Sequence, residues 1–296
     1  MNAKTILLFA ASLSICATVL ADDWPQWRGP TRDGVWKESG IIDKFEGPEI
    51  KRRWSVPIGG GYSGPTVAEG RVYVTDRIDQ PVELERVHCF DWKTGENLWT
   101  HEHEVSYREV NYPAGPRAAV AISDGRAYSL GATGHLFCFA ADSGEILWSH
   151  DCYREYGIRI PNWGITASPI VDGKLVIVMI GGEKDACLVA FHRKSGKEVW
   201  RALADRANYA APIIIEQAGR RVLVVWTGDR IVGLAPASGT LLWDYDYRPR
   251  KMPLGVATPI LHKGLLYFTG FYDGSLLLRL DPDKLAVEKV WHRRGK

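Results

Sequence analysis

Short apolar runs alternate with glycine-containing turns along most of the chain. Three such stretches, each typical of two strands joined by a hairpin, are residues 119–130 (AVAISDGRAYSL), 167–179 (ASPIVDGKLVIVM) and 257–268 (ATPILHKGLLYF). Asp124-Gly125 and Asp172-Gly173 favour these hairpins, because type I′ turns need positive φ angles at their central residues. A third apolar run follows each hairpin, then a turn, and then a fourth run that carries a tryptophan. The pattern predicts repeated units of four antiparallel strands.

The turn and tryptophan recur in register. Residues 90–99 read FDWKTGENLW, and the later copies read FAADSGEILW, FHRKSGKEVW and LAPASGTLLW. Their tryptophans, Trp99, Trp148, Trp200 and Trp243, are separated by steps of 49, 52 and 43 residues. A single four-stranded meander cannot bury both faces of its sheet, so such units must stack on one another. We therefore predict an all-β protein, a β-propeller of four-stranded antiparallel blades with about five blades present.

The recurring residues have a structural interpretation. The glycines, Gly95, Gly144, Gly196 and Gly239, permit the positive φ angle of the turn between the third and fourth strands. The hydroxyl residues before them, Thr94, Ser143, Ser195 and Ser238, can bond to the turn backbone. Each tryptophan ring is large enough to cover the joint between two blades. These residues are predicted to dock the blades together and indicate no catalysis.

The first copy also resembles a known motif. CFDWKTGENLW, residues 89–99, is similar to the tryptophan-docking motif of the pyrroloquinoline quinone (PQQ) repeat family, with Asp91, Thr94, Gly95 and Trp99 matching. A fifth unit, LDPDKLAVEKVW, keeps Trp291 but lacks the Thr-Gly pair. The resemblance implies a propeller, either a quinoprotein dehydrogenase that binds PQQ and calcium or a propeller without redox chemistry, such as BamB. DDWPQWRGPTRDG, residues 22–34, resembles the start of exported, planctomycete-type PQQ-like repeat proteins.

Bulk composition agrees with a globular β-protein. The 296 residues are 46% hydrophobic and include 30 glycines, 12 tryptophans and 12 tyrosines, a mixture that favours short strands and tight turns. The formal net charge is only +2. A nucleic-acid partner is not expected, because no basic field is present.

The N-terminus predicts export. Residues 1–21 combine Lys4, an apolar run at 6–20 and small residues before Asp22, which is typical of a cleaved signal peptide. A membrane anchor is disfavoured because the run is shorter than the roughly 18 residues that a spanning helix needs, and a lipoprotein acylated at Cys16 is disfavoured because bulky Ile15 precedes it. We expect a periplasmic or extracellular protein with no transmembrane segment after cleavage, an extended segment at 22–50 and a propeller domain at 51–296.

Residues 51–58 (KRRWSVPI) read as one more outer strand, with its own Trp54 ahead of the first complete unit. Such a strand normally completes the last blade of a propeller. Here five units follow, and none of them is a three-stranded unit that residues 51–58 could complete. We therefore expect a truncated form of a seven- or eight-bladed propeller.

The residues that redox chemistry would need are not apparent. Quinoprotein dehydrogenases of the family that the motif resembles stack PQQ on a disulfide between adjacent cysteines, and no two cysteines are adjacent in this sequence. The Cys-x-x-Cys-His motif that binds haem does not occur either. Cys89 and Cys138 share a repeat column with Ala190 and Gly233, which favours a tight packing site; the pairing of Cys89, Cys138, Cys152 and Cys187 stays open. His101 and His103 are interpreted as a solvated strand end. No metal site and no catalytic residue is predicted.

Candidate binding residues precede the innermost strands, where loops face the propeller axis. They are Tyr62, Tyr112, Arg117, Asn162, Trp163, Asn208 and Tyr209. Arginine and amide groups among them can orient a polar or anionic ligand on an aromatic platform. The alternative is that the aromatic rings only plug the central funnel. A weaker second group on the same rim comprises Arg77, His135, Lys184, Asp229 and Arg230.

These observations favour an exported, non-catalytic binding or assembly scaffold of the cell envelope. Its partners would be envelope proteins or a small ligand on the rim, with no cofactor. Two other functions stay open: a PQQ-dependent quinoprotein oxidoreductase that acts on alcohols or sugars with PQQ and calcium, and a carbohydrate-binding propeller that uses the aromatic rim. Sequence alone does not indicate the oligomeric state.

Overall fold

The computed structural model describes residues 22–45, 47 and 49–294. It contains five sheets, each made of four consecutive antiparallel strands, which confirms the predicted all-β architecture of four-stranded blades. We number these sheets blade 1 to blade 5 in chain order. The predicted signal peptide at 1–21, with Cys16, lies outside the described residues. No helix among the described residues is long and apolar enough to cross a membrane.

Each blade is a meander from its innermost to its outermost strand. Blade 1 contains β1 (Thr66–Ala68), β2 (Arg71–Ile78), β3 (Leu84–Asp91) and β4 (Asn97–Glu104); blade 2 contains β5 (Ala121–Ser123), β6 (Arg126–Leu130), β7 (His135–Ala140) and β8 (Ile146–Asp151). Blade 3 contains β9 (Ile170–Asp172), β10 (Leu175–Gly182), β11 (Ala186–His192) and β12 (Glu198–Ala202); blade 4 contains β13 (Ile213–Gln217), β14 (Arg220–Trp226), β15 (Arg230–Leu234) and β16 (Leu241–Asp246). Blade 5 contains β17 (Ile260–His262), β18 (Leu265–Gly270), β19 (Gly274–Leu280) and β20 (Val287–Arg293).

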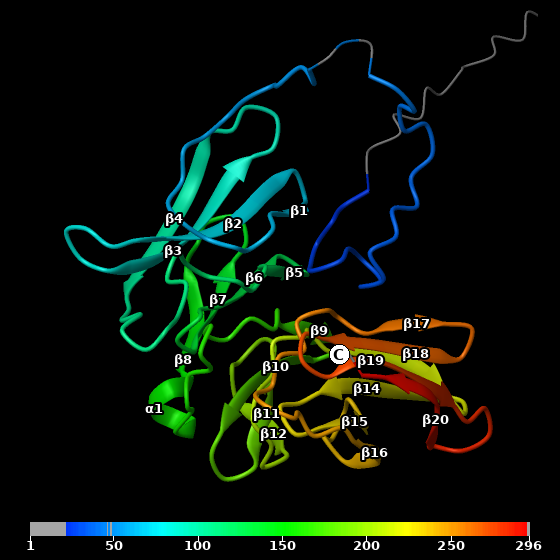
Figure 1. The fold of residues 1–296 in the computed structure, drawn as a ribbon. Helices are drawn as coiled ribbons and strands as arrows, with labels where there is room; N and C mark the ends of the chain where they lie inside the picture. The colour runs from blue at the N-terminus through cyan, green and yellow to red at the C-terminus, as the bar shows by residue number, and fades with distance from the viewer. Residues whose placement is uncertain (1–21, 46, 48, 295–296) are drawn as a thin grey trace, which may run out of the picture.

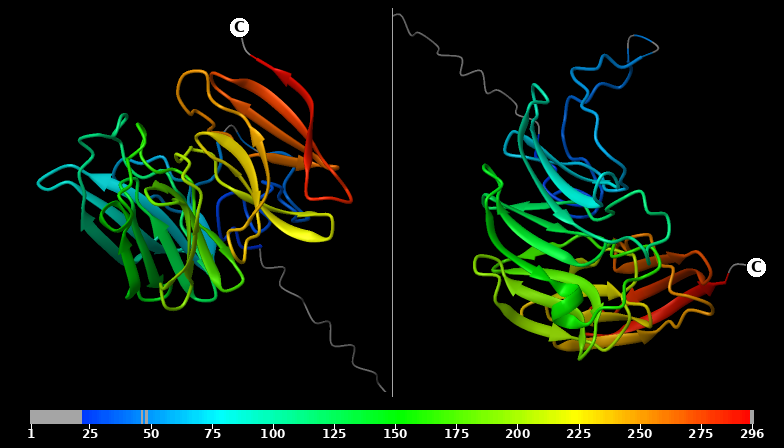
Figure 2. Two further views of the ribbon diagram at one scale, coloured as in Figure 1. Left: turned by 90° about the horizontal axis from the view of Figure 1, so that it is seen from below. Right: turned by 90° about the vertical axis from the view of Figure 1, so that its left-hand side faces the viewer.

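The blades follow one another in an arc, from blade 1 in cyan to blade 5 in orange and red (Figures 1 and 2). The innermost strands β1, β5 and β9 contact one another in that order. The helix α1 (Cys152–Tyr156) follows β8 and is capped by the side chain of Asp151. The segment from residue 22 runs beside blade 1, and its Trp24 forms an isolated bridge with Val67 of β1.

The hairpins between the first two strands have the predicted turn chemistry. Both central residues have positive φ in four blades, at Glu69-Gly70, Asp124-Gly125, Ala218-Gly219 and Lys263-Gly264. This is the type I′ conformation, whose twist matches that of the strands. The blade 3 turn differs, because only Gly173 has a positive φ there.

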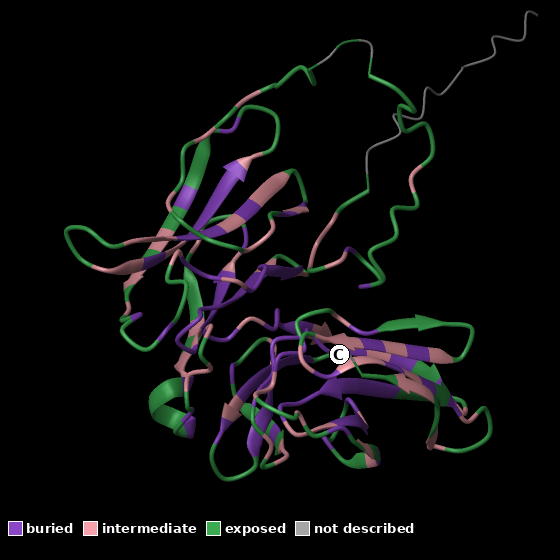
Figure 3. Cartoon of the chain, in the orientation of Figure 1, coloured by how far each residue is buried: buried purple, intermediate pink, exposed green. Residues whose placement is uncertain are grey.

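Buried residues concentrate in the central strands, as Figure 3 shows in purple. Residues 176–180 of β10 and 222–226 of β14 are all buried, so blades 3 and 4 are covered on both faces. In β18 and β19 the burial alternates, with Leu266, Phe268 and Leu276 fully buried between half-buried neighbours. Blade 5 therefore packs tightly on blade 4 through one face only.

Tryptophan rings cover the joints between blades, as predicted. Each ring lies on the turn glycine of the following blade: Trp99 on Gly144, Trp148 on Gly196 and Trp200 on Gly239. A Cβ atom added at these glycines would lie 2.6 to 2.8 Å from the ring. Each indole Nε1 also donates to a turn carbonyl at 3.0 or 3.1 Å, that of Ala141, Arg193 or Pro236 respectively. The glycine is required both for its positive φ and for the space above it.

A β-bulge aims each tryptophan. The pairing between third and fourth strands shifts by one residue directly before every tryptophan, for example between Cys89↔Trp99 and Phe90↔Asn97. An extra residue re-aims the side chains that follow it. Thr94 and the three equivalent serines accept hydrogen bonds from the amide two residues later, which fixes the turn that precedes the bulge.

The joint between blades 4 and 5 uses a different device. The blade 5 turn lacks the glycine, and Trp243 does not donate to it directly. Trp243 Nε1 donates to Gln217 Oε1 at 2.9 Å, and Gln217 Nε2 donates to the Ala286 carbonyl at 2.6 Å and the Lys284 carbonyl at 3.2 Å. The buried amide of Gln217 therefore bridges the two blades where the motif has been lost.

The prediction of an outer strand at residues 51–58 is only partly right. No strand forms at residues 51–58, and each of the five described sheets already has four consecutive strands of its own. Trp54 nevertheless covers Gly95, and its Nε1 donates to the Trp92 carbonyl at 3.0 Å. This is the contact that the tryptophan of a preceding blade would make, so the docking contact is present without the strand.

The cysteines are packing residues. Cys89, Cys138, Cys152 and Cys187 are all buried and unpaired. Cys89 and Cys138 lie opposite Trp99 and Trp148, as Ala190 lies opposite Trp200, which confirms a tight site for a small side chain. Burial raises the pKa of Cys89 to about 11 and that of Cys138 to about 12. These thiols are therefore poor nucleophiles at neutral pH.

Candidate functional site

A cavity of about 700 Å³ opens where the loops before the innermost strands converge. Its lining is dominated by aromatic rings: Trp27, Tyr62, Tyr112, Trp163, Tyr209, Phe271 and Tyr272. The remaining lining residues are Arg117, Thr166, Ser168, Ala211, Leu254, Val256 and Thr258. A concave, mostly apolar site with a few polar groups is typical of small-ligand binding.

Five of the seven predicted rim residues line this cavity: Tyr62, Tyr112, Arg117, Trp163 and Tyr209. Asn162 and Asn208 do not. Asn208 is buried, and its side-chain oxygen accepts from the amides of Tyr209 and Gly255 at 3.0 Å. It orders the loop that presents Tyr209. Ligand binding by the five lining residues stays a prediction.

The rings form a continuous surface with an exposed mouth. Trp163 lies 6.5 Å from Tyr112 and 5.2 Å from Tyr209, measured between ring centroids. Tyr112 is 69% exposed and Phe271 is 78% exposed. Exposed aromatic surface of this kind is unusual unless it is used for binding.

Arg117 organises the wall that carries Tyr112. Its guanidinium donates to the carbonyls of Asn111 and Tyr112 at 3.0 and 2.6 Å, and it lies 4.9 Å from the centroid of Tyr62. Tyr112 has a φ of 54°, a conformation that is costly for a non-glycine residue and that is often found at binding sites. Burial lowers the pKa of Arg117.

Three of the seven aromatic lining residues were not predicted. Trp27 belongs to the N-terminal segment, and its Nε1 donates to Thr258 Oγ1 at 2.9 Å across a sequence separation of 231 residues. Phe271 and Tyr272 lie in the loop between β18 and β19. That loop supplies the aromatic rings that blade 5 lacks at Leu254. A search for aromatic residues in all rim loops would have found the pair, whereas nothing in the sequence indicates the position of Trp27.

The residues of the second rim group form ion pairs or shape turns and do not line the cavity. None of Arg77, His135, Lys184, Asp229 and Arg230 is among the described residues that line the cavity. Arg77 pairs with Glu83 at 2.7 Å. Lys184 has a positive φ of 54° in the β10–β11 turn. His135 lines a separate hollow of about 410 Å³ between blades 1 and 2.

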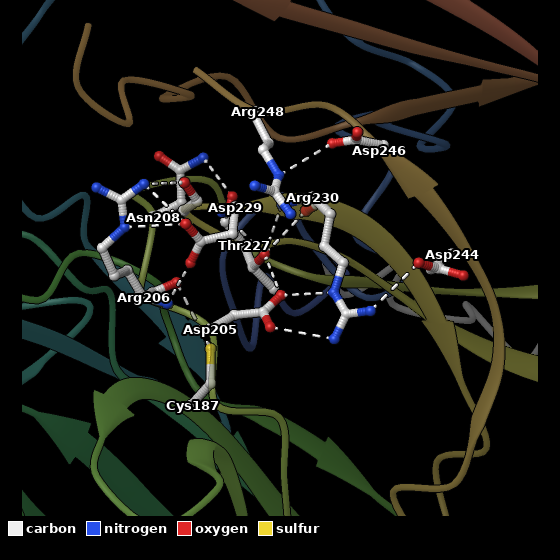
Figure 4. Close-up of polar contacts among 11 residues, drawn as sticks. Cys187, Asp205, Arg206, Asn208, Thr227, Asp229, Arg230, Asp244, Asp246 and Arg248 are labelled. Carbon is white, nitrogen blue, oxygen red and sulfur yellow. Dashed lines mark hydrogen bonds and ion pairs between the residues drawn. The ribbon is translucent and has the colours of Figure 1, made fainter. Parts of the chain in front are cut away.

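Asp229 and Arg230 belong to a network that ties blade 3 to blade 4 (Figure 4). Arg230 Nε pairs with Asp205 Oδ2 at 2.9 Å, and Arg206 Nη2 pairs with Asp229 Oδ1 at 2.8 Å. Thr227 Oγ1 donates to Asp205 Oδ2 at 2.8 Å. Burial holds the pKa of nearby Cys187 well above its usual range. The network holds loops in place and leaves few free groups for chemistry.

The interpretation of His101 and His103 as a solvated strand end is wrong. Both rings pack between blades 1 and 2, at 4.7 and 4.8 Å from Phe137. Burial and the neighbouring imidazoles lower the pKa of His103 to about 3. Glu85 lies 3.6 Å from His103, and burial raises the pKa of this carboxyl. No group of three or more histidine, cysteine or acidic side chains that could hold a metal occurs among the described residues.

Comparison with known proteins shows two groups of relatives. Quinoprotein alcohol dehydrogenase PedH of Pseudomonas putida is 32% identical over 139 residues, which is 44% of this chain and 22% of that protein. Quinohemoprotein alcohol dehydrogenase of Comamonas testosteroni is 22% identical over 286 residues, which is 91% of this chain and 38% of that protein. The chain thus spans less than two fifths of the length of these relatives.

Solved structures show the same fold. The crystal structure of the Comamonas testosteroni enzyme has a TM-score of 0.65 at 16% identity and covers 93% of this chain and 49% of that chain. BamB from Moraxella catarrhalis has a TM-score of 0.55 at 14% identity, over 82% of this chain and 67% of that chain. The sequence profile of one family, described as outer membrane protein assembly factor BamB, matches residues 83–293. The chain therefore belongs to the PQQ-repeat propeller family that this BamB profile describes.

Proposed function

We propose that this chain is a non-catalytic binding scaffold of the cell envelope and that the aromatic cavity is its binding site. The observation that carries the proposal is the chemistry of the lining. Seven aromatic side chains and one arginine surround about 700 Å³, with no carboxylate, imidazole or thiol among the described lining residues. Imidazoles and carboxylates are the most common general acids and bases, and a hydroxyl nucleophile is usually activated by such a neighbouring base, which this lining does not supply. Large rigid rings support binding by stacking and by burial of apolar surface.

Placement in the envelope is supported by two observations. The matching family profile is named for an outer membrane assembly factor. The apolar run at 6–20 is typical of a signal peptide. The occupant of the cavity would be a small ligand or the exposed side chains of an envelope protein.

The second candidate is a PQQ-dependent oxidoreductase, which the names of the curated relatives favour. A flat quinone suits a cavity walled by Tyr112, Trp163 and Tyr209. Calcium does not suit it, because that ion takes six to eight oxygen ligands, usually including carboxylates, and the described lining offers hydroxyls but no carboxylate. The lining does not fit a calcium–quinone centre, so we derive no catalytic step from it.

The binding proposal is tested by calorimetric titration with indole-3-acetamide, a neutral, flat probe of about 13 heavy atoms. At about 0.3 to 0.4 kcal/mol per atom, we expect a dissociation constant of roughly 0.2 to 1 mM. Trp163→Ala should weaken binding by about fivefold or more, since it removes a cavity wall. Tyr153→Ala is the matched control, because Tyr153 is 48% exposed on α1, outside the cavity. Absence of binding, or equal loss in both variants, would contradict the proposal.

A further inference from the structure

The N-terminal segment forms part of the cavity. Trp24 exchanges backbone hydrogen bonds of 2.7 and 3.0 Å with Val67 of blade 1, and the Pro25 carbonyl accepts from Ile122 of blade 2 at 2.8 Å. Trp27 then bonds to Thr258, directly before blade 5, and lines the cavity. One segment thus contacts the inner strands of blades 1 and 2 and the loop before blade 5, and it contributes Trp27 to the cavity lining.

This segment places a buried arginine against two residues, Gln26 and Pro169, that are sequence neighbours of cavity-lining residues. Arg32 is 6% exposed, and its Nη1 donates at 3.2 Å to Gln26 Oε1 and to the Pro169 carbonyl. Gln26 precedes Trp27, and Pro169 follows Ser168; both Trp27 and Ser168 line the cavity. Arg32 Nε and Nη2 have no hydrogen-bond partner among the described residues, nor does any described carboxylate pair with this side chain.

A buried guanidinium without a counter-charge is costly. Burial and the neighbouring Arg28 lower the pKa of Arg32 to about 9, as expected for an uncompensated cation. Arg117, in the cavity wall, is likewise bonded to carbonyls and not to a carboxylate. The acidic residue whose charge influences Arg117 is Glu85. The ring of Tyr107 faces Arg117, and the Tyr107 hydroxyl donates a hydrogen bond to Glu85. Two cations therefore act on a cavity whose described lining contains no acid.

We propose that the cavity selects ligands that carry a negative charge and that Arg32, together with Arg117, supplies this selectivity. This inference rests on the proposed function and adds the class of ligand: an apolar or aromatic body with a carboxylate or similar anionic group. The ligand need not touch Arg32, because charge interactions act over distance. At a separation of about 10 Å and an effective dielectric constant of about 20, one unit charge changes affinity roughly tenfold.

The test uses two probes that differ in charge and hardly in shape, indole-3-acetate and indole-3-acetamide, titrated into the full chain by calorimetry. The wild-type protein should bind the acetate at least tenfold more tightly. Arg32→Gln should lower this preference roughly tenfold without changing the affinity for the amide, and Arg32→Lys should retain most of it. Arg126→Gln is the matched control, because Arg126 Nε also lacks a partner, but this residue lies at the β5–β6 hairpin outside the cavity lining.

Each outcome decides the question. Equal wild-type affinity for both probes would overturn the inference while leaving the proposed function intact. Equal loss of both probes in Arg32→Gln would show that the residue only holds the segment in place. Failure of both probes to bind the wild type would contradict the proposed function, and this inference with it; failure of the acetate alone would overturn only the inference. If Arg32→Gln does not fold, a wild-type crystal structure with 5-bromoindole-3-acetate decides. A carboxylate turned toward Arg117, Trp27 and Ser168 supports the inference, and a carboxylate turned to solvent overturns it.

Discussion

The joints between blades predict that two glycine substitutions with the same backbone cost will have different effects. Gly144 has a φ of 74°, and an added Cβ would lie 2.7 Å from Trp99 Cδ2. Gly125 has a φ of 66°, and an added Cβ would meet no atom within 4 Å. Gly144→Ala should therefore suffer both backbone strain and displacement of the Trp99 ring, whereas Gly125→Ala should suffer strain alone.

The magnitudes follow from the contacts. Alanine in a left-handed conformation costs about 1 to 2 kcal/mol, which is the full effect expected for Gly125→Ala. A tryptophan ring buries roughly 150 to 250 Å², worth about 4 to 6 kcal/mol at about 25 cal/mol per Å². Losing about half of that burial, with weakening of the bond from Trp99 Nε1 to the Ala141 carbonyl, adds roughly 2 to 4 kcal/mol. Gly144→Ala should therefore lower the free energy of unfolding by about 3 to 6 kcal/mol.

Urea unfolding followed by far-ultraviolet circular dichroism measures both variants without relying on tryptophan emission. A third variant isolates the contact: in a Trp99→Leu background, Gly144→Ala should cost no more than Gly125→Ala, because the ring is gone. Equal destabilisation by Gly144→Ala and Gly125→Ala in the native background would refute the docking argument. It would show that the glycine serves the turn alone.

Three further predictions concern other parts of the fold. Gln217→Ala should destabilise the protein by about 1 to 3 kcal/mol in urea unfolding, because it leaves Trp243 Nε1 and the blade 5 turn carbonyls unpaired; a variant as stable as the wild type would argue against the bridge. The pKa of His103 is about 3 in the fold against about 6.5 when unfolded, so its neutral form supports full stability above pH 6.5. The free energy of unfolding should fall below that pH, by up to about 1.4 kcal/mol per pH unit. His103→Phe should reduce the change of the urea midpoint between pH 4.5 and 7.5. An unchanged pH dependence in this variant would show that another group titrates. The buried thiol of Cys138 should resist alkylation at pH 8 in the folded protein and react on unfolding, as mass spectrometry would show.

The blade architecture was predictable because its determinants are local. Gly144 and Trp148 lie within one turn and strand, and the same spacing recurs at Gly196 and Trp200. Positive φ at the glycine, the hairpin and the strand period are properties of a few adjacent residues. The aromatic rim was predictable for the same reason, since Tyr112 and Trp163 lie in the loops that lead into the innermost strands β5 and β9.

The contacts that were missed join distant parts of the chain. Trp27 reaches the cavity through Thr258, and Gln217 replaces a docking turn near residue 284, without any motif at either position. His103 alternates with His101 as an exposed strand end would, and its burial depends on Phe137 of the next blade. Trp54 makes the docking contact without a strand, because a ring needs only the glycine turn below it whereas an outer strand needs three inner strands of its own blade.

The central claim is that the cavity binds without catalysing a reaction. The most direct test is a titration of the purified chain with PQQ, with and without calcium, followed by quenching of tryptophan fluorescence and by alcohol-dependent reduction of an acceptor dye. We expect the same quenching curve with and without calcium and no dye reduction above the blank. The reason is that the described lining holds no carboxylate that could bind calcium or abstract a proton. Saturable binding that requires calcium, together with dye reduction, would contradict it and identify the chain as part of a dehydrogenase.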